Sequence, residues 1–357
     1  MNARLTRLRA EMDRMGLDAV WINSPENYLY FSYFDNPDGW MLITKKHAFV
    51  FADFRYIEAA RREANEDCTV IMPTAPRRSY LPPLIEEDSV RTIGYEDASL
   101  SCRGLDSLRA DLPGCTFSPL GNLLPELRAV KTPDEVEHIV AAQRIAEAAL
   151  ADLLGVIRPD MTELEVAAEL EYRMKKRGSV KPSFDTIAVS GSNSSSPHGV
   201  PRNVKLERGF LTMDFGAMVA GYHSDMTRTI VIGRADAEMK RLYNTVLAAQ
   251  AAAQAALRPG ARNAEMDKIA RDIIDGAGYA GCFGHSLGHG VGLLIHEMPN
   301  LSGGAGERVL HAGEIVTNEP GIYLEGKYGC RIEDMALITE DGARNLTEAP
   351  KDLIEIL

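Results

Sequence analysis

Residues 212–230 read TMDFGAMVAGYHSDMTRTI, and the architecture of the second part of the chain can be worked out from them. Two runs rich in aromatic and β-branched residues flank a turn of small residues, which predicts a β-hairpin. Asp214 and Asp225 lie equally far from a turn between Val219 and Ala220, so we expect their carboxylates to oppose each other. Opposed residues lie about 4.5–5.5 Å apart. Two carboxylates that close are costly unless a cation bridges them or one takes up a proton.

A second pair of acidic residues repeats this pattern. Glu319 and Glu333 lie equally far from Gly326, at the ends of two strand-like arms, so this hairpin also opposes two carboxylates. Three of the eight histidines fall between the hairpins within twelve residues: His285, His289 and His296. Four carboxylates and an imidazole suit two adjacent divalent metals, and oxygen-rich ligation with one nitrogen favours Mn²⁺, Co²⁺, Fe²⁺ or Zn²⁺. Two such metals can activate a water and stabilise an oxyanion.

Simpler interpretations exist for each of these residues taken alone. A single acidic residue of either pair is equally well explained as a solvated strand residue, His198 as a loop histidine and His285 as a core histidine. Two other motifs fail. The run Gly288-His-Gly-Val-Gly lacks the spacing of a dinucleotide-binding loop, and His296-Glu297 does not extend to the H-E-x-x-H of zinc proteases.

The chain of 357 residues divides into two expected domains. Strands alternating with helices predict an α/β domain over residues 1–125. Gly121, Pro125 and Pro133 punctuate the boundary, and the second domain covers residues 126–357. Capping boxes that begin at Thr132 and Thr162 predict two of its helices.

Composition and charge limit the classes of function. An apolar fraction of 45% and a charged fraction of 25% are those of a globular protein. The net charge of −12 argues against nucleic acid and anionic membranes as partners. No run approaches the roughly 18 apolar residues of a membrane span. The five scattered cysteines fit a reducing compartment, and acidic residues follow the N-terminal arginines where a signal peptide has its apolar core, so we expect a cytoplasmic protein.

Five sequence blocks together resemble the metal site of the pita-bread metallopeptidases. They are Met213-Asp-Phe-Gly-Ala, Ser224-Asp-Met-Thr-Arg-Thr, Gly288-His-Gly-Val-Gly with Ile295-His-Glu, Thr317-Asn-Glu-Pro-Gly-Ile-Tyr and Arg331-Ile-Glu-Asp. The family includes Xaa-Pro aminopeptidases, Xaa-Pro dipeptidases (prolidases), methionine aminopeptidases and creatinases. The resemblance implies an α+β pita-bread catalytic domain, creatinase/aminopeptidase-like, after residue 125. A weaker resemblance, through Asn27-Tyr-Leu-Tyr and Asp53-Phe-Arg-Tyr, implies that the α/β domain is of the creatinase/prolidase N-terminal type.

The resemblance also implies two divalent metal ions per chain, with manganese preferred and cobalt, zinc or iron as alternatives. By position, the ligands are Asp214, Asp225, His289, Glu319 and Glu333. Asp225 would bind one metal through both oxygens, and Asp214 and Glu333 would bridge the two metals. Glu319 would also serve as general base or proton shuttle.

Three further histidines match substrate-contacting positions of the family. His198 and His296 correspond to residues that contact the scissile amide and the transition state, and His285 to a histidine at the entrance of aminopeptidase P-like members. The implied function is hydrolysis of the N-terminal Xaa-Pro bond of short peptides, by a homodimer. Methionine aminopeptidases generally lack such an N-terminal domain, which argues against that activity. The complete ligand set argues against a creatinase, which does not use the metals. A non-catalytic binding protein with the pita-bread fold is the more remote alternative, and metal content would distinguish it.

The choice between aminopeptidase and dipeptidase depends on one position. Dipeptidases of this family often carry Arg just after the His-Glu-x-Pro block, where it can clamp the free carboxylate of the substrate. This chain has Asn300 there, which favours an Xaa-Pro aminopeptidase, with an Xaa-Pro dipeptidase as the alternative if another cation such as Arg202 takes that role.

Overall fold

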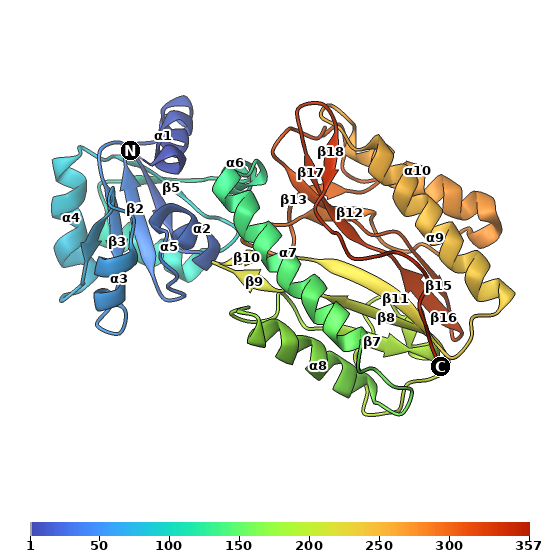
Figure 1. Cartoon of the computed structure of the whole chain (residues 1–357). Helices are drawn as coiled ribbons and strands as arrows, with labels where there is room; N and C mark the ends of the chain where they lie inside the picture. The colour runs from blue at the N-terminus through green and yellow to red at the C-terminus, as the bar shows by residue number, and fades with distance from the viewer. Residues whose placement is uncertain (1) are drawn as a thin grey trace. The chain divides into compact units, whose positions relative to one another are not determined.

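A computed structural model describes residues 2–357, which form two compact units that divide between Leu127 and Arg128 (Figure 1). The first unit contains a mixed six-stranded sheet of order β4-β3-β2-β1-β5-β6 with helices packed around it. Its strands are β1 (Ala19–Ile22), β2 (Trp40–Thr44), β3 (Ala48–Phe51), β4 (Thr69–Ile71), β5 (Thr92–Tyr95) and β6 (Thr116–Pro119). Its helices are α1 (Ala3–Met15), α2 (Pro25–Ser32), α3 (Ile57–Glu63), α4 (Arg77–Glu87) and α5 (Cys102–Asp111), and α6 (Leu123–Ala129) spans the division.

Local sequence explains most of the first unit. Leu5, Leu8 and Met12 recur at helical spacing and are fully buried, so they attach α1 to the core. Gly16 ends this helix at a φ of 68°, in the left-handed region that glycine adopts without strain. Both tryptophans of the chain belong to this core, and the rings of Trp21 and Trp40 stack with their centroids 4.5 Å apart.

The second unit contains two main sheets and four long helices. The four-stranded sheet has the order β19-β11-β8-β7 and the five-stranded sheet the order β13-β12-β14-β17-β18. The helices are α7 (Pro133–Leu154), α8 (Glu163–Lys176), α9 (Ala237–Ala256) and α10 (Asn263–Ile274), with short helical turns η1 (Gly191–Ser195) and η2 (Asp275–Tyr279). The first sheet comprises β7 (Ile187–Ser190), β8 (Gly209–Phe215), β11 (Met226–Ile232) and β19 (Glu355–Ile356). The second comprises β12 (Gly288–Gly290), β13 (Glu297–Leu301), β14 (Ile315–Asn318), β17 (Asp334–Ile338) and β18 (Ala343–Asn345). Two hairpins complete the unit: β9 (Met218–Val219) with β10 (Tyr222–His223), and β15 (Gly321–Leu324) with β16 (Tyr328–Arg331).

Alternation along β8 separates two apolar layers and directs Asp214 between them. Leu211 and Met213 belong to the core under α7 and α8, whereas Phe210 belongs to the core under α9 and α10. The helices of each pair lie side by side (Figure 1). Because side chains of a strand alternate between its faces, Asp214 projects on the same side as Phe210, away from α7 and α8. A carboxylate in a buried strand therefore points into the interior of the unit.

The expected helix starts of this unit are confirmed. Glu135 accepts a hydrogen bond from the backbone N–H of Thr132 at 2.9 Å, and Glu165 accepts one from that of Thr162 at 2.7 Å. Each therefore closes a capping box. In the described part of the chain, none of the helices is both long and apolar enough to cross a membrane.

Candidate metal centre

The eight predicted catalytic, substrate-binding and metal-binding residues line one pocket of about 680 Å³ in the second unit. They are His198, Asp214, Asp225, His285, His289, His296, Glu319 and Glu333. They come from loops and strands up to 135 positions apart, so the fold and not local sequence brings them together.

The register of the aspartate hairpin differs from the expected one. Asp214 pairs with Thr227, not with Asp225, because the turn lies at Ala220 and Gly221, one position later than expected. These two residues have φ angles of 50° and 83°, as the two central residues of a tight hairpin turn require. Asp225 therefore lies diagonally from Asp214, at the break between β10 and β11.

The glutamate hairpin has the expected register. Residues pair symmetrically about Gly326 in β15 and β16, and Asn318 and Asp334 continue the same symmetry in β14 and β17. Glu319 and Glu333 occupy the gap between these two ladders and thus lie at opposed positions. Thr227 donates its hydroxyl hydrogen to Oε2 of Glu333 at 2.6 Å, which links this hairpin to the aspartate hairpin.

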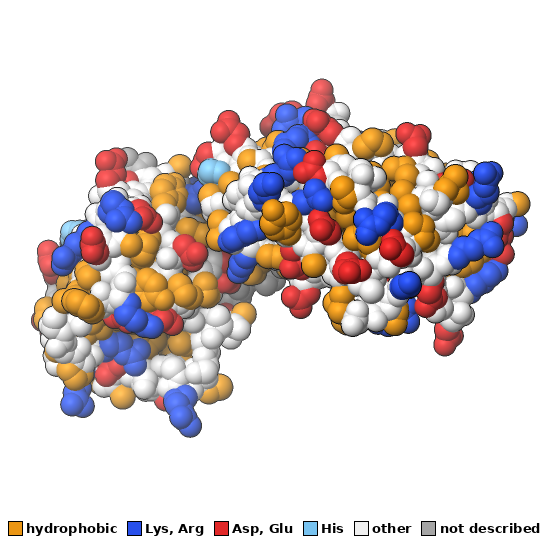
Figure 2. Space-filling model, turned by 60° about the horizontal axis from the view of Figure 1, so that its bottom comes forward, with side chains coloured by type: hydrophobic (Ala, Val, Ile, Leu, Met, Phe, Trp, Pro, Cys, Tyr) orange, Lys and Arg blue, Asp and Glu red, His pale blue; other side chains and the backbone are white. Residues whose placement is uncertain are grey.

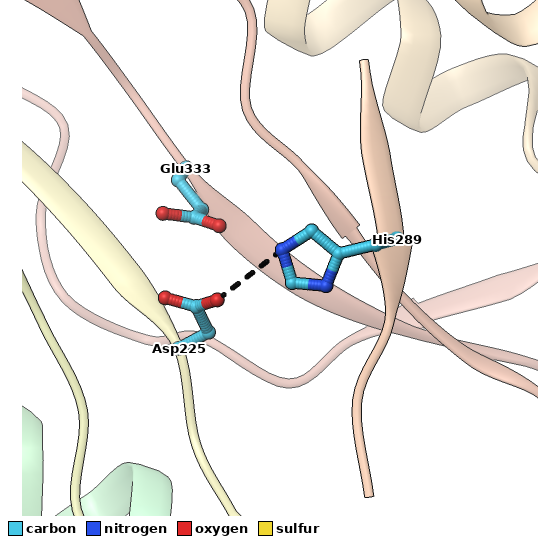
Figure 3. Close-up of side chains that lie close together, drawn as sticks. All are labelled: Asp225, His289 and Glu333. Atoms are coloured by element: carbon cyan, nitrogen blue, oxygen red, sulfur yellow. Dashed lines mark ion pairs between the residues drawn. The ribbon is translucent and has the colours of Figure 1, made fainter. Parts of the chain in front are cut away.

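His289 completes the cluster from β12. Its Nδ1 hydrogen-bonds the carbonyl of Gly290 at 3.1 Å, which leaves Nε2 directed at the carboxylates. Nε2 lies 3.3 Å from Oε1 of Glu319 and 3.6 Å from Oδ2 of Asp225. One ligand atom each from Asp225, His289 and Glu333 lies within 4.8 Å of the others, and Figure 3 shows the three side chains converging. Such a set of two oxygens and one nitrogen can hold a metal ion.

The electrostatics of this cluster are those of carboxylates without enough counter-charge. Burial raises the pKa of Asp225 well above its usual value, and Glu333 and Asp214 raise it further. Burial also raises the pKa of Glu333, with Glu319 adding to the effect. Glu319 is the exception, because the hydrogen bond and charge of His289 overcome burial and lower its pKa to about 2. His289 shows the reciprocal change: burial would lower its pKa, but Glu319 raises it.

The donor atoms fit divalent cations. Oδ1 of Asp214 and Oδ1 of Asp225 are buried, and neither has a hydrogen-bond partner among residues 2–357. A buried acceptor without a partner is costly, and a cation would satisfy it. Hard oxygen donors together with one imidazole nitrogen match the ligand preferences of Mn²⁺, Co²⁺, Fe²⁺ and Zn²⁺. The residues present therefore fit the metals that the sequence predicts.

Arg331 is a buried cation at this site, and its role is not predicted from the sequence. Its Nη2 lies 2.6 Å from Oδ2 of Asp214 and its Nη1 donates to the hydroxyl of Tyr323 at 2.7 Å. The same hydroxyl lies 2.9 Å from Nε2 of His285, so these four residues form one network. Arg331 lies in a block that the sequence analysis quotes, but only its contacts with a segment more than a hundred positions away reveal its partner.

The pocket is also lined by His296, Asn300 and His198. The ring of His296 packs edge-on against that of His289 with centroids 4.2 Å apart, and burial lowers its pKa. Asn300 lines the pocket, as the sequence analysis assumed. Arg202 is not a pocket residue: its guanidinium binds the buried carboxylate of Glu163, so the suggestion that it clamps a substrate carboxylate is wrong. The cause is that a carboxylate as deeply buried as Glu163 needs a cationic partner.

Comparisons with known proteins agree with this geometry. Residues 137–340 match the model of metallopeptidase family M24, and residues 4–130 match that of the creatinase/prolidase N-terminal domain. The Xaa-Pro dipeptidase of Pyrococcus furiosus is 38% identical over 99% of this chain and 100% of its own length. Among solved structures, the Xaa-Pro dipeptidase from Bacillus anthracis has a TM-score of 0.94 at 37% identity, with 99% of each chain covered. The X-Pro aminopeptidase from Thermotoga maritima has a TM-score of 0.90 at 34% identity and covers 97% of this chain and 100% of its own.

Proposed function

The chain belongs to metallopeptidase family M24, with an α/β creatinase-type N-terminal unit and a pita-bread unit, and we propose that it is an Xaa-Pro dipeptidase. The observation that carries a hydrolytic function is the convergence of five metal-type ligands and three histidines in one pocket. Similarity over nearly the full length to proteins named Xaa-Pro dipeptidase supports the dipeptidase over the aminopeptidase that Asn300 predicts. We propose residues 1–125 and 126–357 as the two domains, with a boundary two residues before the division between Leu127 and Arg128.

We propose that Asp214, Asp225, His289, Glu319 and Glu333 hold two divalent cations, with manganese preferred. When bound, the cations would polarise the carbonyl before proline and lower the pKa of water, which is the chemistry that such centres supply. Arg331 would orient Asp214 through their 2.6 Å contact, and it opposes the burial that raises the pKa of Asp214. Thr227 would orient Glu333 in the same way.

The remaining residues would handle protons and developing charge. Glu319 is ionised at neutral pH, with its pKa at about 2, and would accept a proton and pass it to the leaving proline nitrogen. His296 and His198 would donate hydrogen bonds to the oxygen that becomes negative and to the scissile amide. Burial lowers the pKa of His296, so its neutral ring would donate through one nitrogen only. His285 would contact substrate near the entrance, held by Tyr323.

An Xaa-Pro aminopeptidase is the second candidate, and a specific observation favours it. A dipeptide ends in a carboxylate directly after the proline ring, and such a charge is best held by the paired N–H groups of Arg. Asn300 offers only neutral hydrogen bonds at the pocket wall, and Arg202 is occupied by Glu163. A tripeptide, with a neutral amide at that point, loses nothing.

Substrate length decides between these candidates. We expect a higher kcat/KM for Xaa-Pro than for Xaa-Pro-Yaa, and near silence on Xaa-Ala-Yaa. Asn300→Arg should raise dipeptide hydrolysis relative to tripeptide hydrolysis, with Asn300→Gln as the uncharged control. Tripeptide preference in the wild type would establish the aminopeptidase instead. Absence of all Xaa-Pro hydrolysis together with absence of bound metal would leave a binding protein as the remaining candidate.

We propose further that the enzyme acts in the cytoplasm, as a homodimer, on short peptides and not on nucleic acid or membranes. The net charge of −12 supports the exclusion of polyanions. On the face drawn in Figure 2, Lys and Arg side chains are interspersed with Asp and Glu rather than gathered into one basic surface. Sedimentation of the purified protein tests the dimer, and titration with duplex DNA tests the exclusion.

A further inference from the structure

His198 lines the pocket as an exposed loop residue. Within residues 2–357 its side chain makes no hydrogen bond. Its position therefore depends on the loop between β7 and Arg202, which we call the 191–201 loop. This loop begins with the helical turn η1 and also supplies Val200 to the pocket.

The buried carboxylate of Glu163 joins both ends of the 191–201 loop, and the more exposed carboxylate of Glu207 also contacts Ser192 and Arg202. Glu163, the first residue of α8, has a fully buried side chain. At one end of the loop it accepts hydrogen bonds from the backbone N–H and hydroxyl of Ser190, at 2.8 and 2.9 Å. At the other end it accepts from the backbone N–H, Nε and Nη2 of Arg202, at 2.9, 3.0 and 2.9 Å. In the middle, Asn193 donates to it at 3.0 Å and also to the carbonyl of Val200 at 3.1 Å.

The chemistry of Glu163 suits this task. All six groups that contact Glu163 are hydrogen-bond donors, so a carboxylate with two equivalent acceptor oxygens satisfies them. Bonds to a charged acceptor are also stronger than bonds to a neutral one. Burial opposes ionisation, but Arg202 and the backbone donors lower the pKa of Glu163, so it is ionised at neutral pH. On the pocket side, Nη1 of Arg331 donates to the carbonyl of Pro197 at 3.2 Å. The loop is thus fixed from two sides.

We infer that Glu163 is a positioning residue, which fixes the 191–201 loop and thereby places His198 against the scissile amide. The inference rests on the proposed function, because it assumes that His198 contacts the substrate. Glu163 itself is absent from the pocket lining, so it would not contact a substrate bound there. It would act on turnover only through His198 and its loop.

Glu163→Gln tests this inference with little change of shape. The amide NH₂ of Gln would face a donor at Ser190 or Arg202, so one end of the loop would be released. We expect kcat to fall by up to about 10²-fold, as displacement of a catalytic group typically causes. Metal content should stay that of the wild type. Hydrogen–deuterium exchange in peptides covering 191–201 should become faster.

Glu314→Gln is the matched control. Glu314 is also fully buried and ion-paired, with Oε1 2.8 Å from Arg308, but it does not line the pocket. Its substitution should lower thermal stability while kcat and exchange in the 191–201 loop stay unchanged. Equal losses of kcat in Glu314→Gln and Glu163→Gln would mean that general destabilisation explains the effect, and would overturn the inference.

A double-mutant cycle with His198→Ala separates positioning from structure. If Glu163 acts through His198, Glu163→Gln should cost kcat in the wild-type background and add no further loss in His198→Ala. Equal losses in both backgrounds, or unchanged exchange of the 191–201 loop, would overturn the inference even if Xaa-Pro hydrolysis is established. Failure of the proposed function would appear separately, as a wild type inactive on every Xaa-Pro substrate. If Glu163→Gln does not fold, Arg202→Gln, at the more exposed end of the contact, gives the same cycle with the same expected outcomes.

Discussion

Replacing Glu297 by Gln should destabilise the second unit far more than any change to a surface ion pair. Glu297 follows His296 directly, but its side chain points into the protein and is 2% exposed. Nζ of Lys131, whose side chain is 1% exposed, lies 2.8 Å from Oε1. Nε of Arg128 lies 3.4 Å from Oε2. Gln would keep the shape and remove the charge that both cations face.

The size of the effect follows from burial. Removing one partner of a buried ion pair typically costs about 3–5 kcal/mol, because it leaves an uncompensated charge without water. Lys131→Met should cost less, since it leaves Glu297 with Arg128. An exposed pair such as Arg158 and Asp160, 66% and 65% exposed, contributes less than about 1 kcal/mol. The expected order of destabilisation is therefore Glu297→Gln, then Lys131→Met, then Asp160→Asn.

Urea unfolding followed by far-ultraviolet circular dichroism measures this order. The midpoint of the transition that belongs to the second unit should shift in proportion to the lost free energy, with an unchanged slope. A shift for Glu297→Gln no larger than that for Asp160→Asn would refute the reasoning from burial. Glu297 directly follows His296, so loss of its ion pairs would also loosen the backbone that positions His296. In this variant kcat should therefore fall together with stability.

Four other results are expected. Ala at Asp225, His289 or Glu333 should abolish turnover and lower the metal content found by elemental analysis; full metal content in His289→Ala would exclude it as a ligand. After chelation, Glu333→Gln should melt above the wild type in scanning calorimetry, because it relieves the carboxylate crowding that raises the pKa of Asp225. His296→Ala should retain its metals and lose about 10²–10³-fold in kcat, as is usual for one oxyanion donor; parallel loss of metal would make it a ligand instead. In the folded protein the pKa of Glu163 lies below its ordinary 4.5, so its ionised carboxylate contributes fully to stability above pH 4.5. This contribution is lost as the pH falls through the folded pKa. The stability of Glu163→Gln should therefore lack this loss when it is measured against falling pH.

Much of the fold follows from local patterns in the sequence. The alternation of strands and helices expected for residues 1–125 and both capping boxes of the second unit depend on residues close in sequence, and the structure contains them. Helix α4 is not predictable from its local sequence, because Pro82 and Pro83 lie inside it and proline disfavours a helix interior. Leu81 and Ile85 are buried under this helix, so packing outweighs the local preference.

The residues of the candidate site could be predicted from the sequence, but not all the contacts between them. The symmetric spacing of Glu319 and Glu333 about Gly326 gave their register correctly. Asp214 and Asp225 are not opposed although their spacing predicts it. The hairpin turn needs two residues with positive φ angles, and these are Ala220 and Gly221. The partners of Arg331, Glu163 and Glu297 were not predictable, since each lies far away in the sequence and contact depends on the packed fold.

Because both tryptophans lie in the first unit, tryptophan fluorescence reports on that unit and not on the second. Trp21 and Trp40 account for all the indole of the protein, and the second unit relies on tyrosine and phenylalanine for its aromatic absorption. Indole emission will therefore record events in one unit and be nearly silent about the pocket in the other. Unfolding curves that differ between tryptophan emission and circular dichroism would reveal two successive transitions. A single tryptophan introduced near the pocket would make emission sensitive to the second unit as well.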